Sequence, residues 1–600
     1  MKNPAFTRLF VLLLLVSTAF TVLCAETPAA IVKADTPIMP LSEIQTGMRG
    51  VAYTVFEGVT PEPMDVEILG VLRNANGPKG DIILTRLHGK KVEYTGVVAG
   101  MSGSPVYIDG KLVGAIAFRI GEFSKEPIAG VTPIEEMLEI NALDKTPAPD
   151  ASETAARGLT TRTSGPGVSS GMQHVANLLQ PIETPLVFSG FTTDAVNRFA
   201  PQFAEAGITP VMGAGSVSNE KQPEPIEAGS AVSAILVRGD LNIAATCTVT
   251  YMDPERLLAC GHPLMQFGMV DMPMTKARVL ATLPSPANAF KIVNTTEPIG
   301  TFVQDRHTGI LGRFDKQPEM IPVTLNIHGT SRPKQFHYEV LNNSKLTPVA
   351  MMATVFSALQ GVNDGGEDIT YRMNGIISVN GYSSVHLQNM FAPSDGNQPT
   401  ALLAALSLGD RFGRIYQNPF DKAKVKGVEL DFDIVRERRS ALLESARTDV
   451  TEARPGDEIV VESVLRPYRG ERIVRQVPIK IPTSTPKGTL RILISDGNTL
   501  DRMRNMGPSF SRRMDLASTI ALLNKEHSND RLYVSLLEAN PQAMVEDKVM
   551  PAMPVSVMNV MEGMRGTQDM VVLGESSVSE SSTPLDYVVS GAQVITVSVK

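Results

Sequence analysis

The sequence predicts a mainly β protein built from several domains, and three observations support this. At 600 residues and 64.6 kDa the chain is too long for one hydrophobic core. Hydrophobic residues make up 43% and charged residues 20%, as in globular domains and unlike disordered or polytopic membrane proteins. The 48 glycines and 42 prolines favour many short strands and turns over long helices.

The charge balance limits the class of partner. The chain has 55 basic and 63 acidic residues, which gives a net charge of −8. A weakly acidic chain of this kind lacks the basic surface that nucleic acid requires. We therefore expect no nucleic-acid partner.

The N-terminus has the pattern of an export signal. Two basic residues precede an apolar run over residues 9–23, and small residues follow it. This order is typical of a signal peptide, here residues 1–25, and the run is short for a transmembrane helix. We therefore expect an exported protein, periplasmic or associated with the cell envelope. Lipid anchoring at Cys24 is an alternative that Leu23 disfavours, because a small residue is usual before a lipidated cysteine.

Cys247 and Cys260 are the two cysteines that remain once the signal is removed. They flank a turn, and their midpoint falls between Asp253 and Pro254, so a symmetric hairpin places them opposite each other. Opposed strand residues lie about 4.5–5.5 Å apart at Cα, which a disulfide can bridge. In an oxidising compartment we expect this disulfide to form, and two free buried thiols are the alternative.

Changes in composition divide the chain into segments. Residues 144–172 are poor in large aliphatic side chains and rich in Pro, Ala, Ser, Thr and Gly, which is typical of a flexible linker. β-rich blocks lie on both sides of it. Helices are expected at residues 133–142, 193–207, 347–359 and 400–408. The units expected after the signal are 36–143, the linker 144–172, 173–318, a β-rich module at 319–437, an Ig-like sandwich module at 438–496 and a mixed α/β region at 497–600.

Ser102 lies in the segment Gly96-Val-Val-Ala-Gly-Met-Ser-Gly-Ser-Pro105, before a predicted strand and an Asp109-Gly110 hairpin turn. Glycines beside a serine can expose its hydroxyl and let successive backbone N–H groups point at one spot. Such a spot is what the oxyanion of acyl transfer needs. A Ser/Gly-rich β-turn without chemistry is the alternative.

His262 lies in Leu257-Leu-Ala-Cys-Gly-His-Pro263, directly after an apolar strand. A serine nucleophile needs a nearby base, and histidine is the usual one because its pKa is near neutrality. A carboxylate orients the base in such triads. Asp305 is the candidate, Asp271 is its rival, and either can instead cap a turn. A metal pair of Cys260 and His262 lacks further ligands at useful spacing, so we expect no metal and no cofactor.

These two segments resemble those of the SpoIVB (sporulation stage IV B) peptidase family. The serine segment, residues 96–116, contains the family's GMSGSP motif. The histidine segment, residues 230–312, contains a strand pair leading to Gly-His and, downstream, a Gly-Ile-x-Gly pattern. The family is trypsin-like, with two six-stranded barrels and the active site between them, and the resemblance implies this fold.

The resemblance also implies roles for individual residues. Ser102, and not Ser104, is implied as the nucleophile, because trypsin-like motifs place it two residues after the first glycine. His262 is implied as the general base. The backbone at Gly100 and Met101, up to the nucleophile, is implied as the oxyanion hole.

The chain departs from the family in two ways. Its histidine segment follows the serine segment, whereas the order is reversed in the sporulation peptidase. The fold class we expect is therefore a circularly permuted trypsin-like double β-barrel, with halves at 36–143 and 173–318, followed by β-sandwich (Ig-like) modules with some helices. In addition, His88 lies near the position of an acidic residue in the family's prototype. Asp305 is preferred as the third triad member because trypsin-like barrels place the acid about as far after the histidine.

Two functions from different classes are expected. The first is an exported serine endopeptidase that acts on protein or peptide substrates by acyl transfer, with residues 144–171 as a candidate self-cleavage site. The second is a catalytically inactive, peptidase-like scaffold or binding protein of the cell envelope. The C-terminal half carries no catalytic pattern, so its modules are expected to bind a cell-envelope partner.

Overall fold

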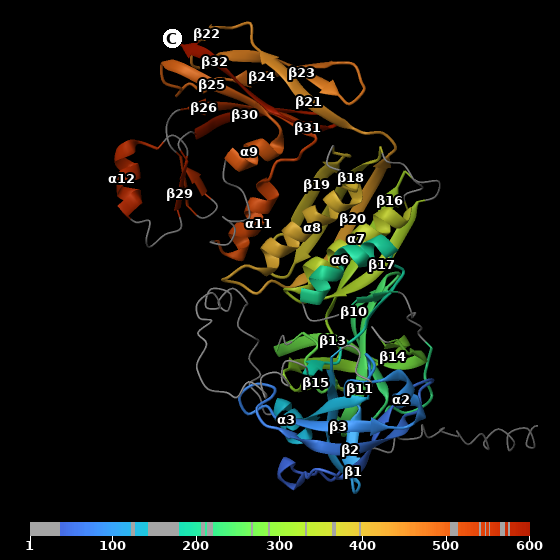
Figure 1. Cartoon of the computed structure of the whole chain (residues 1–600). Coiled ribbons are helices and arrows are strands. Elements are labelled where there is room, and N and C mark those ends of the chain that lie inside the picture. The colour runs from blue at the N-terminus through green and yellow to red at the C-terminus, as the bar shows by residue number, and fades with distance from the viewer. Residues whose placement is uncertain are drawn as a thin grey trace, which may run out of the picture.

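The computed structural model is a succession of β-sheet units (Figure 1). The expected signal peptide with Cys24 and the expected linker at 144–172 lie outside the described residues. Within those residues, no helix is long and apolar enough to cross a membrane. The structure describes residues 36–121, 126–141, 179–205, 210–212, 220–265, 268–285, 289–329, 333–362, 368–394, 398–503, 514–538, 542–545, 548–550, 553–563, 570–573 and 576–600.

The first six strands form a closed barrel, which we call the serine barrel. Their order is β4-β1-β2-β3-β6-β5, and pairing of β4 with β5 closes the ring. Asp109 and Gly110, with φ of 50° and 77°, form the turn between β4 and β5, as the Asp-Gly signal predicts. The elements are η1 (Leu41–Glu43), β1 (Arg49–Thr54), β2 (Glu62–Leu72), β3 (Ile82–His88), α2 (Lys90–Thr95), β4 (Pro105–Ile108), β5 (Lys111–Ile120), β6 (Ile128–Pro133), α3 (Ile134–Leu138) and η2 (Glu139–Asn141).

A second closed barrel follows, which we call the histidine barrel. Its order is β11-β10-β13-β14-β15-β12, and pairing of β11 with β12 closes the ring. Counted from its own first strand, each barrel places its strands around the ring in the order first, second, third, sixth, fifth and fourth. The predicted mainly β fold with two barrels is therefore confirmed, while its origin by circular permutation stays a prediction. The strands are β10 (Ala231–Gly239), β11 (Asn242–Met252), β12 (Arg256–Ala259), β13 (Gly268–Leu283), β14 (Phe290–Arg306) and β15 (Gly309–Arg313).

Apolar side chains from both barrels meet around α3. Ile134 and Met137 of this helix are fully buried, in one cluster with Leu112 of β5 and with Leu258 and Leu311 of the histidine barrel. Full burial of a large apolar side chain stabilises by roughly 1.5–3 kcal/mol. The contact therefore holds the two barrels together as one body.

The sheet of the histidine barrel continues into the middle of the molecule, where helices cover it (Figure 1). Strand β10 pairs with β17, and the order then runs β17-β16-β20-β18-β19. The helix expected at 400–408 extends to Tyr416, because Phe412 and Ile415 prolong its buried face. The elements are β7 (Leu179–Pro181), β8 (Leu186–Ser189), α6 (Thr193–Glu205), β9 (Pro210–Met212), β16 (Met320–His328), β17 (Lys334–Leu341), α7 (Leu346–Val362), β18 (Thr370–Val379), β19 (Val385–Phe391), α8 (Thr400–Tyr416) and β20 (Val425–Val435).

Two sheets of a β-sandwich form the far end of the molecule, around one apolar core. The sheets are β24-β23-β21-β31 and β22-β32-β25-β26-β30, so the sandwich draws strands from both 438–496 and 497–600. The elements are β21 (Ser440–Arg447), β22 (Glu452–Ala453), β23 (Glu458–Pro467), β24 (Ile473–Lys480), β25 (Gly488–Ser495), α9 (Gly497–Met503), α11 (Leu516–Lys525), β26 (Arg531–Glu538), β27 (Gln542–Val545), β28 (Lys548–Met550), α12 (Val555–Gly563), β29 (Met570–Leu573), β30 (Ser576–Pro584), β31 (Val588–Ser590) and β32 (Ala592–Val599).

Candidate active site

The loop that carries Ser102 connects α2 to β4 and lies against the histidine barrel. Ser102 is fully buried, and its Oγ is a buried atom without a hydrogen-bond partner. Gly100 and Gly103 have φ of 93° and 96°, a conformation that side chains other than glycine rarely adopt. The glycines therefore set the sharp path of the loop. Ser104 is also buried, and its Oγ donates to the Met101 carbonyl at 2.6 Å.

Two backbone N–H groups of this loop remain available. The N–H of Met101 donates to the Val98 carbonyl at 3.1 Å, and that of Gly103 donates to the Ile116 carbonyl at 2.8 Å. Within the described part of the chain, the N–H groups of Gly100 and Ser102 donate to no acceptor. In the expected oxyanion hole, the N–H groups of Gly100 and Ser102 are therefore free, and that of Met101 is already bonded.

His262 lies in the loop after β12 and is 3% exposed. Its Nδ1 lies 2.7 Å from the Pro263 carbonyl, whereas its Nε2 is buried without a hydrogen-bond partner. Because a carbonyl can only accept, the Nδ1 must carry the proton, which leaves a lone pair on Nε2 of the neutral ring. Burial lowers the pKa of His262, an effect opposed in part by the backbone of Pro263 and of Ile182.

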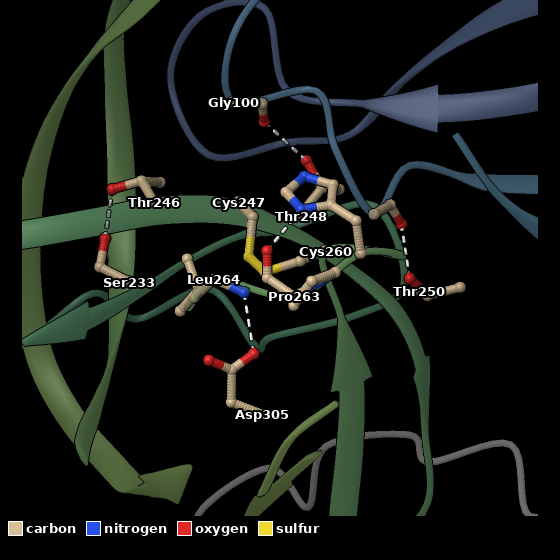
Figure 2. The surroundings of a disulfide bond; sticks show 12 residues. Gly100, Ser233, Thr246, Cys247, Thr248, Thr250, Cys260, Pro263, Leu264 and Asp305 are labelled. Atoms are coloured by element: carbon tan, nitrogen blue, oxygen red, sulfur yellow. Dashed lines mark hydrogen bonds between the residues drawn. A yellow bond between two sulfur atoms is a disulfide. The ribbon is translucent and has the colours of Figure 1, made fainter. Parts of the chain in front are cut away.

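Thr248 of β11 joins the two loops. Its N–H donates to the Ser102 carbonyl at 2.8 Å, and its own carbonyl accepts from the Cys260 N–H at 3.2 Å. Its Oγ1 donates to the Gly100 carbonyl at 3.1 Å (Figure 2). Thr248 therefore links the serine segment to the histidine segment.

Gly103 permits this close approach. A Cβ at this position would lie 1.9 Å from the Thr248 carbonyl oxygen and 2.6 Å from the Cys260 nitrogen. Thr250 Oγ1 donates to the Gly103 carbonyl at 2.8 Å. The backbone of the serine loop therefore packs directly on the backbone of the histidine barrel.

The predicted disulfide joins Cys247 and Cys260, whose Cα atoms are 5.3 Å apart (Figure 2). The symmetric hairpin from which it was predicted is wrong in detail. A bulge shifts the β11–β12 register between Val249 and Tyr251, and Cys260 leaves the strand with φ of 68°. The disulfide thus anchors the turn two residues before His262.

The candidate acids lie in different places. Asp305 is fully buried, and its two carboxylate oxygens accept from the N–H groups of Leu264 and Met265 at 2.8 and 2.7 Å. It therefore binds the loop that follows His262. Asp271 accepts from the Glu319 N–H at 2.9 Å, and burial raises its pKa.

His88, near the position of the family prototype's acid, ends β3. Its Nε2 lies 3.3 Å from the Glu67 carboxylate, and its side chain is 42% exposed. Its ring thus contacts a carboxylate at the surface of the serine barrel, a setting that favours a structural role.

Residues 19–138 match the family model described as SpoIVB peptidase S55. The predicted resemblance is confirmed for this segment, which is about a fifth of the chain and contains Ser102 but ends before His262. No curated protein and no solved structure matches the chain. The SpoIVB-like segment thus corresponds to the serine barrel.

Sequence reasoning did not find Lys291, which lies beneath the serine loop. Its side chain is 1% exposed, and Nζ donates to Thr54 Oγ1 at 2.7 Å. Burial lowers the pKa of Lys291 to about 7. A Cβ on Gly100 would lie 3.3 Å from Lys291 Cδ, so the lysine stem packs against the start of the oxyanion segment. Nothing in the sequence around a lysine near the start of a strand predicts that it will be buried beside the serine loop.

Proposed function

We propose that the protein is an exported serine endopeptidase of SpoIVB type, with Ser102 as nucleophile and His262 as general base. The observation that carries the proposal is the hydrogen-bonded path from Ser102 through Thr248 to Cys260, two residues before His262. The path joins the serine and histidine loops. At both loops a side-chain atom that the reaction needs is buried without a partner.

The protonation of His262 suits the first step. The Pro263 carbonyl holds the proton on Nδ1, and burial keeps the ring neutral by lowering its pKa. Ser102 Oγ and His262 Nε2 are not hydrogen-bonded to each other in this structure. Once substrate binding brings them together, Nε2 takes the proton of Ser102 as Oγ forms a bond to the carbonyl carbon of a peptide. His262 gives the same proton to the departing amine when the peptide bond breaks. Water then attacks the acyl-enzyme, His262 takes a proton from the water and returns it to the serine oxygen, and the acid product leaves.

The negative charge of the tetrahedral intermediate would fall on an oxygen beside the serine loop. The unpaired N–H groups of Gly100 and Ser102 are suited to donate hydrogen bonds to this oxygen. Removal of one such donor typically costs about 10²–10³ in kcat. Fixed backbone donors act without reorganisation, so their placement by two left-handed glycines favours catalysis.

Asp305 serves in this proposal as a positioning residue. Its carboxylate holds Leu264 and Met265, and this fixes the turn on which the imidazole is mounted. Asp271 is the weaker candidate because its carboxylate binds the backbone of Glu319, next to β16.

The second candidate function, a catalytically inactive scaffold, is favoured by the complete burial of Ser102. A fluorophosphonate probe separates the two candidates, because it forms a bond to a serine oxygen only when that oxygen is activated. Peptide mapping of the labelled protein should find the probe on Ser102. Absence of label under every condition, including conditions that open the site, would support the scaffold.

Substitutions test the assignment. Ser102→Ala and His262→Ala should each lower peptidase activity by about 10³-fold or more, and the double variant should be hardly worse, because the pair acts as a unit. Ser104→Ala is the matched control. Its hydroxyl only holds the Met101 carbonyl, so the variant should keep activity within about tenfold and lose about 1 kcal/mol of unfolding free energy. Loss of activity in Ser104→Ala with activity retained in Ser102→Ala would reverse the assignment.

A further inference from the structure

A short segment of the chain lies where β4 leaves the edge of β5 free. Strand β7 pairs antiparallel with β5, with Phe118 opposite Pro181, Arg119 opposite Gln180 and Ile120 opposite Leu179. Strand β4 covers the same strand only as far as Ala115. We call residues 179–182 the strap. It is thus an added strand on an open sheet edge.

The strap and the serine loop bond to successive residues of β5. The Ile116 carbonyl accepts from the Gly103 N–H at 2.8 Å, and the Ile116 N–H donates to the Ser104 carbonyl at 2.9 Å. The next carbonyl along β5, that of Ala117, accepts from the Ile182 N–H at 2.8 Å. The backbone of Ile182 therefore lies beside the loop of the nucleophile.

The strap also reaches the histidine. Ile182 is fully buried in the apolar cluster that contains Val98 and Met101, and its backbone lies close enough to His262 to influence the ring. Ser102 itself has no exposed surface in this arrangement. A peptide from another molecule therefore has no path to the nucleophile.

We propose that the strap occupies the binding site of the substrate strand, so that substrate and strap compete for the edge of β5. This inference rests on the proposed function, since it presupposes that Ser102 acts on peptides. Edge-strand pairing is a general mode of peptide recognition, in which main-chain hydrogen bonds give affinity and side-chain pockets give specificity. The substrate is therefore an extended peptide with an aliphatic residue in the place of Ile182.

The attachment of the strap is suited to displacement. The pairing spans three residues, Gln180 and Pro181 are exposed, and Pro181 has no N–H to donate. The anchors are the buried side chains of Leu179 and Ile182 and an ion pair of Glu183 with Arg119. Beside it, Arg119 and Ile120 line a cavity of about 550 Å³ whose other wall includes Gly96 and Val97. Space for a further substrate side chain thus adjoins the strap.

Reactivity of a thiol in place of Ser102 tests the inference without relying on catalysis. In a Ser102→Cys background, iodoacetamide alkylation at position 102 is followed by peptide mapping. Ile182→Glu places a carboxylate in the buried anchor and should raise the rate by about tenfold or more, because it opens the strap. Gln180→Glu places the same charge on the exposed side of the same segment and should stay within about twofold of the background. Equal rates in the two variants would overturn the proposal.

Further arms keep the test decisive. If Ile182→Glu does not fold by circular dichroism, Ile182→Ala should still raise the rate by about threefold, and no rise would overturn the proposal. The peptide Leu-Gln-Pro-Ile should protect the thiol of the opened variant, whereas Leu-Gln-Pro-Glu should not. If the first peptide does not protect the thiol, the edge of β5 is not a peptide-binding site. If the thiol of the opened variant is reactive but fluorophosphonate never labels Ser102 in the parent protein, the strap proposal is supported and Ser102 is not the nucleophile.

Discussion

Lys291 at the barrel interface is a buried base and His527 in the C-terminal half is a partly buried one, and their surroundings differ. Lys291 donates to the hydroxyl of Thr54, and no carboxylate among the described residues pairs with it. Burial lowers its pKa to about 7. His527 lies between the carboxylates of Asp501 and Glu580, which overcome the cost of burial and raise its pKa to about 9.

The contrast indicates where the chain retains costly groups. At the barrel interface, His262 and Lys291 are buried with no carboxylate partner among the described residues, and the Oγ of Ser102 is unpaired. In the C-terminal half, Arg411 and Arg414 share the carboxylate of Glu526. Buried titratable groups without a charged partner cluster at functional sites, whereas ion-paired groups are typical of structural networks. The difference favours chemistry at the interface and a structural or binding role for the rest.

Gly103→Ala should break the interface most severely. Its Cβ would overlap the Thr248 carbonyl, and φ of 96° is strained for alanine. We expect loss of Ser102 labelling and a drop of about 3 kcal/mol or more in the unfolding free energy of the barrels, measured by urea denaturation. Gly110→Ala is the control, since it has φ of 77° but no atom within 4 Å, and should cost about 1 kcal/mol. Equal losses would show that the contact with Thr248 is unimportant.

Removal of the disulfide should act on the histidine barrel alone. Cys247→Ala with Cys260→Ala opens a loop with a sequence separation of 13 and should cost about 2–4 kcal/mol in unfolding free energy. The unfolding of the β-sandwich, followed by hydrogen exchange, should not change. Dithiothreitol should reproduce the effect in the parent protein and add nothing in the double variant. A further loss of stability in the double variant would show that dithiothreitol acts on something other than this disulfide.

Lys291 and His527 should give pH dependences of stability of opposite sign. The folded pKa of Lys291 is lowered to about 7 from 10.5, so its destabilising effect is full below pH 7 and is relieved as pH rises towards 10.5. The folded pKa of His527 is raised to about 9 from 6.5, so its stabilising effect is full below pH 6.5 and is lost as pH rises through 9.

Two variants measure these slopes. Lys291→Met should raise Tm at pH 7 by a few degrees, with a gain that shrinks towards pH 10. His527→Gln should lower Tm at pH 6 and have less effect above pH 9. Thermal unfolding at several pH values provides the measurement. If the change in Tm caused by each substitution shifted with pH in the way expected for the other, the contrast between the two regions would be contradicted.

Local sequence patterns predicted the serine loop, the hairpin turn at Asp109 and Gly110, and most strands, because turn chemistry and apolar alternation act over few residues. The disulfide was predicted although its hairpin is bulged, since a bulge after Val249 changes the register without separating the cysteines much. The mainly β character and the sandwich strands were predictable at this level, whereas the two barrels were expected only from the resemblance to the SpoIVB peptidases.

Long-range contacts were not predictable. Thr248 is an ordinary threonine in a strand, and only the approach of a loop almost 150 residues earlier gives it a role. The three residues of β7 include Pro181 and show no alternation that would predict a strand. Their pairing depends on an edge of β5 about 60 residues earlier, which a single sequence does not reveal.

The order of the two barrels along the chain also sets the timing of biosynthesis. A ribosome releases the serine barrel, which ends with β6 at Pro133, well before the strands from β10 to β15. Domains generally fold as units during synthesis, at about 5–20 residues per second. A nascent chain therefore carries Ser102 for several seconds with no imidazole from residue 262 beside it. Translation itself delays assembly of the site until most of the first half of the polypeptide has been made.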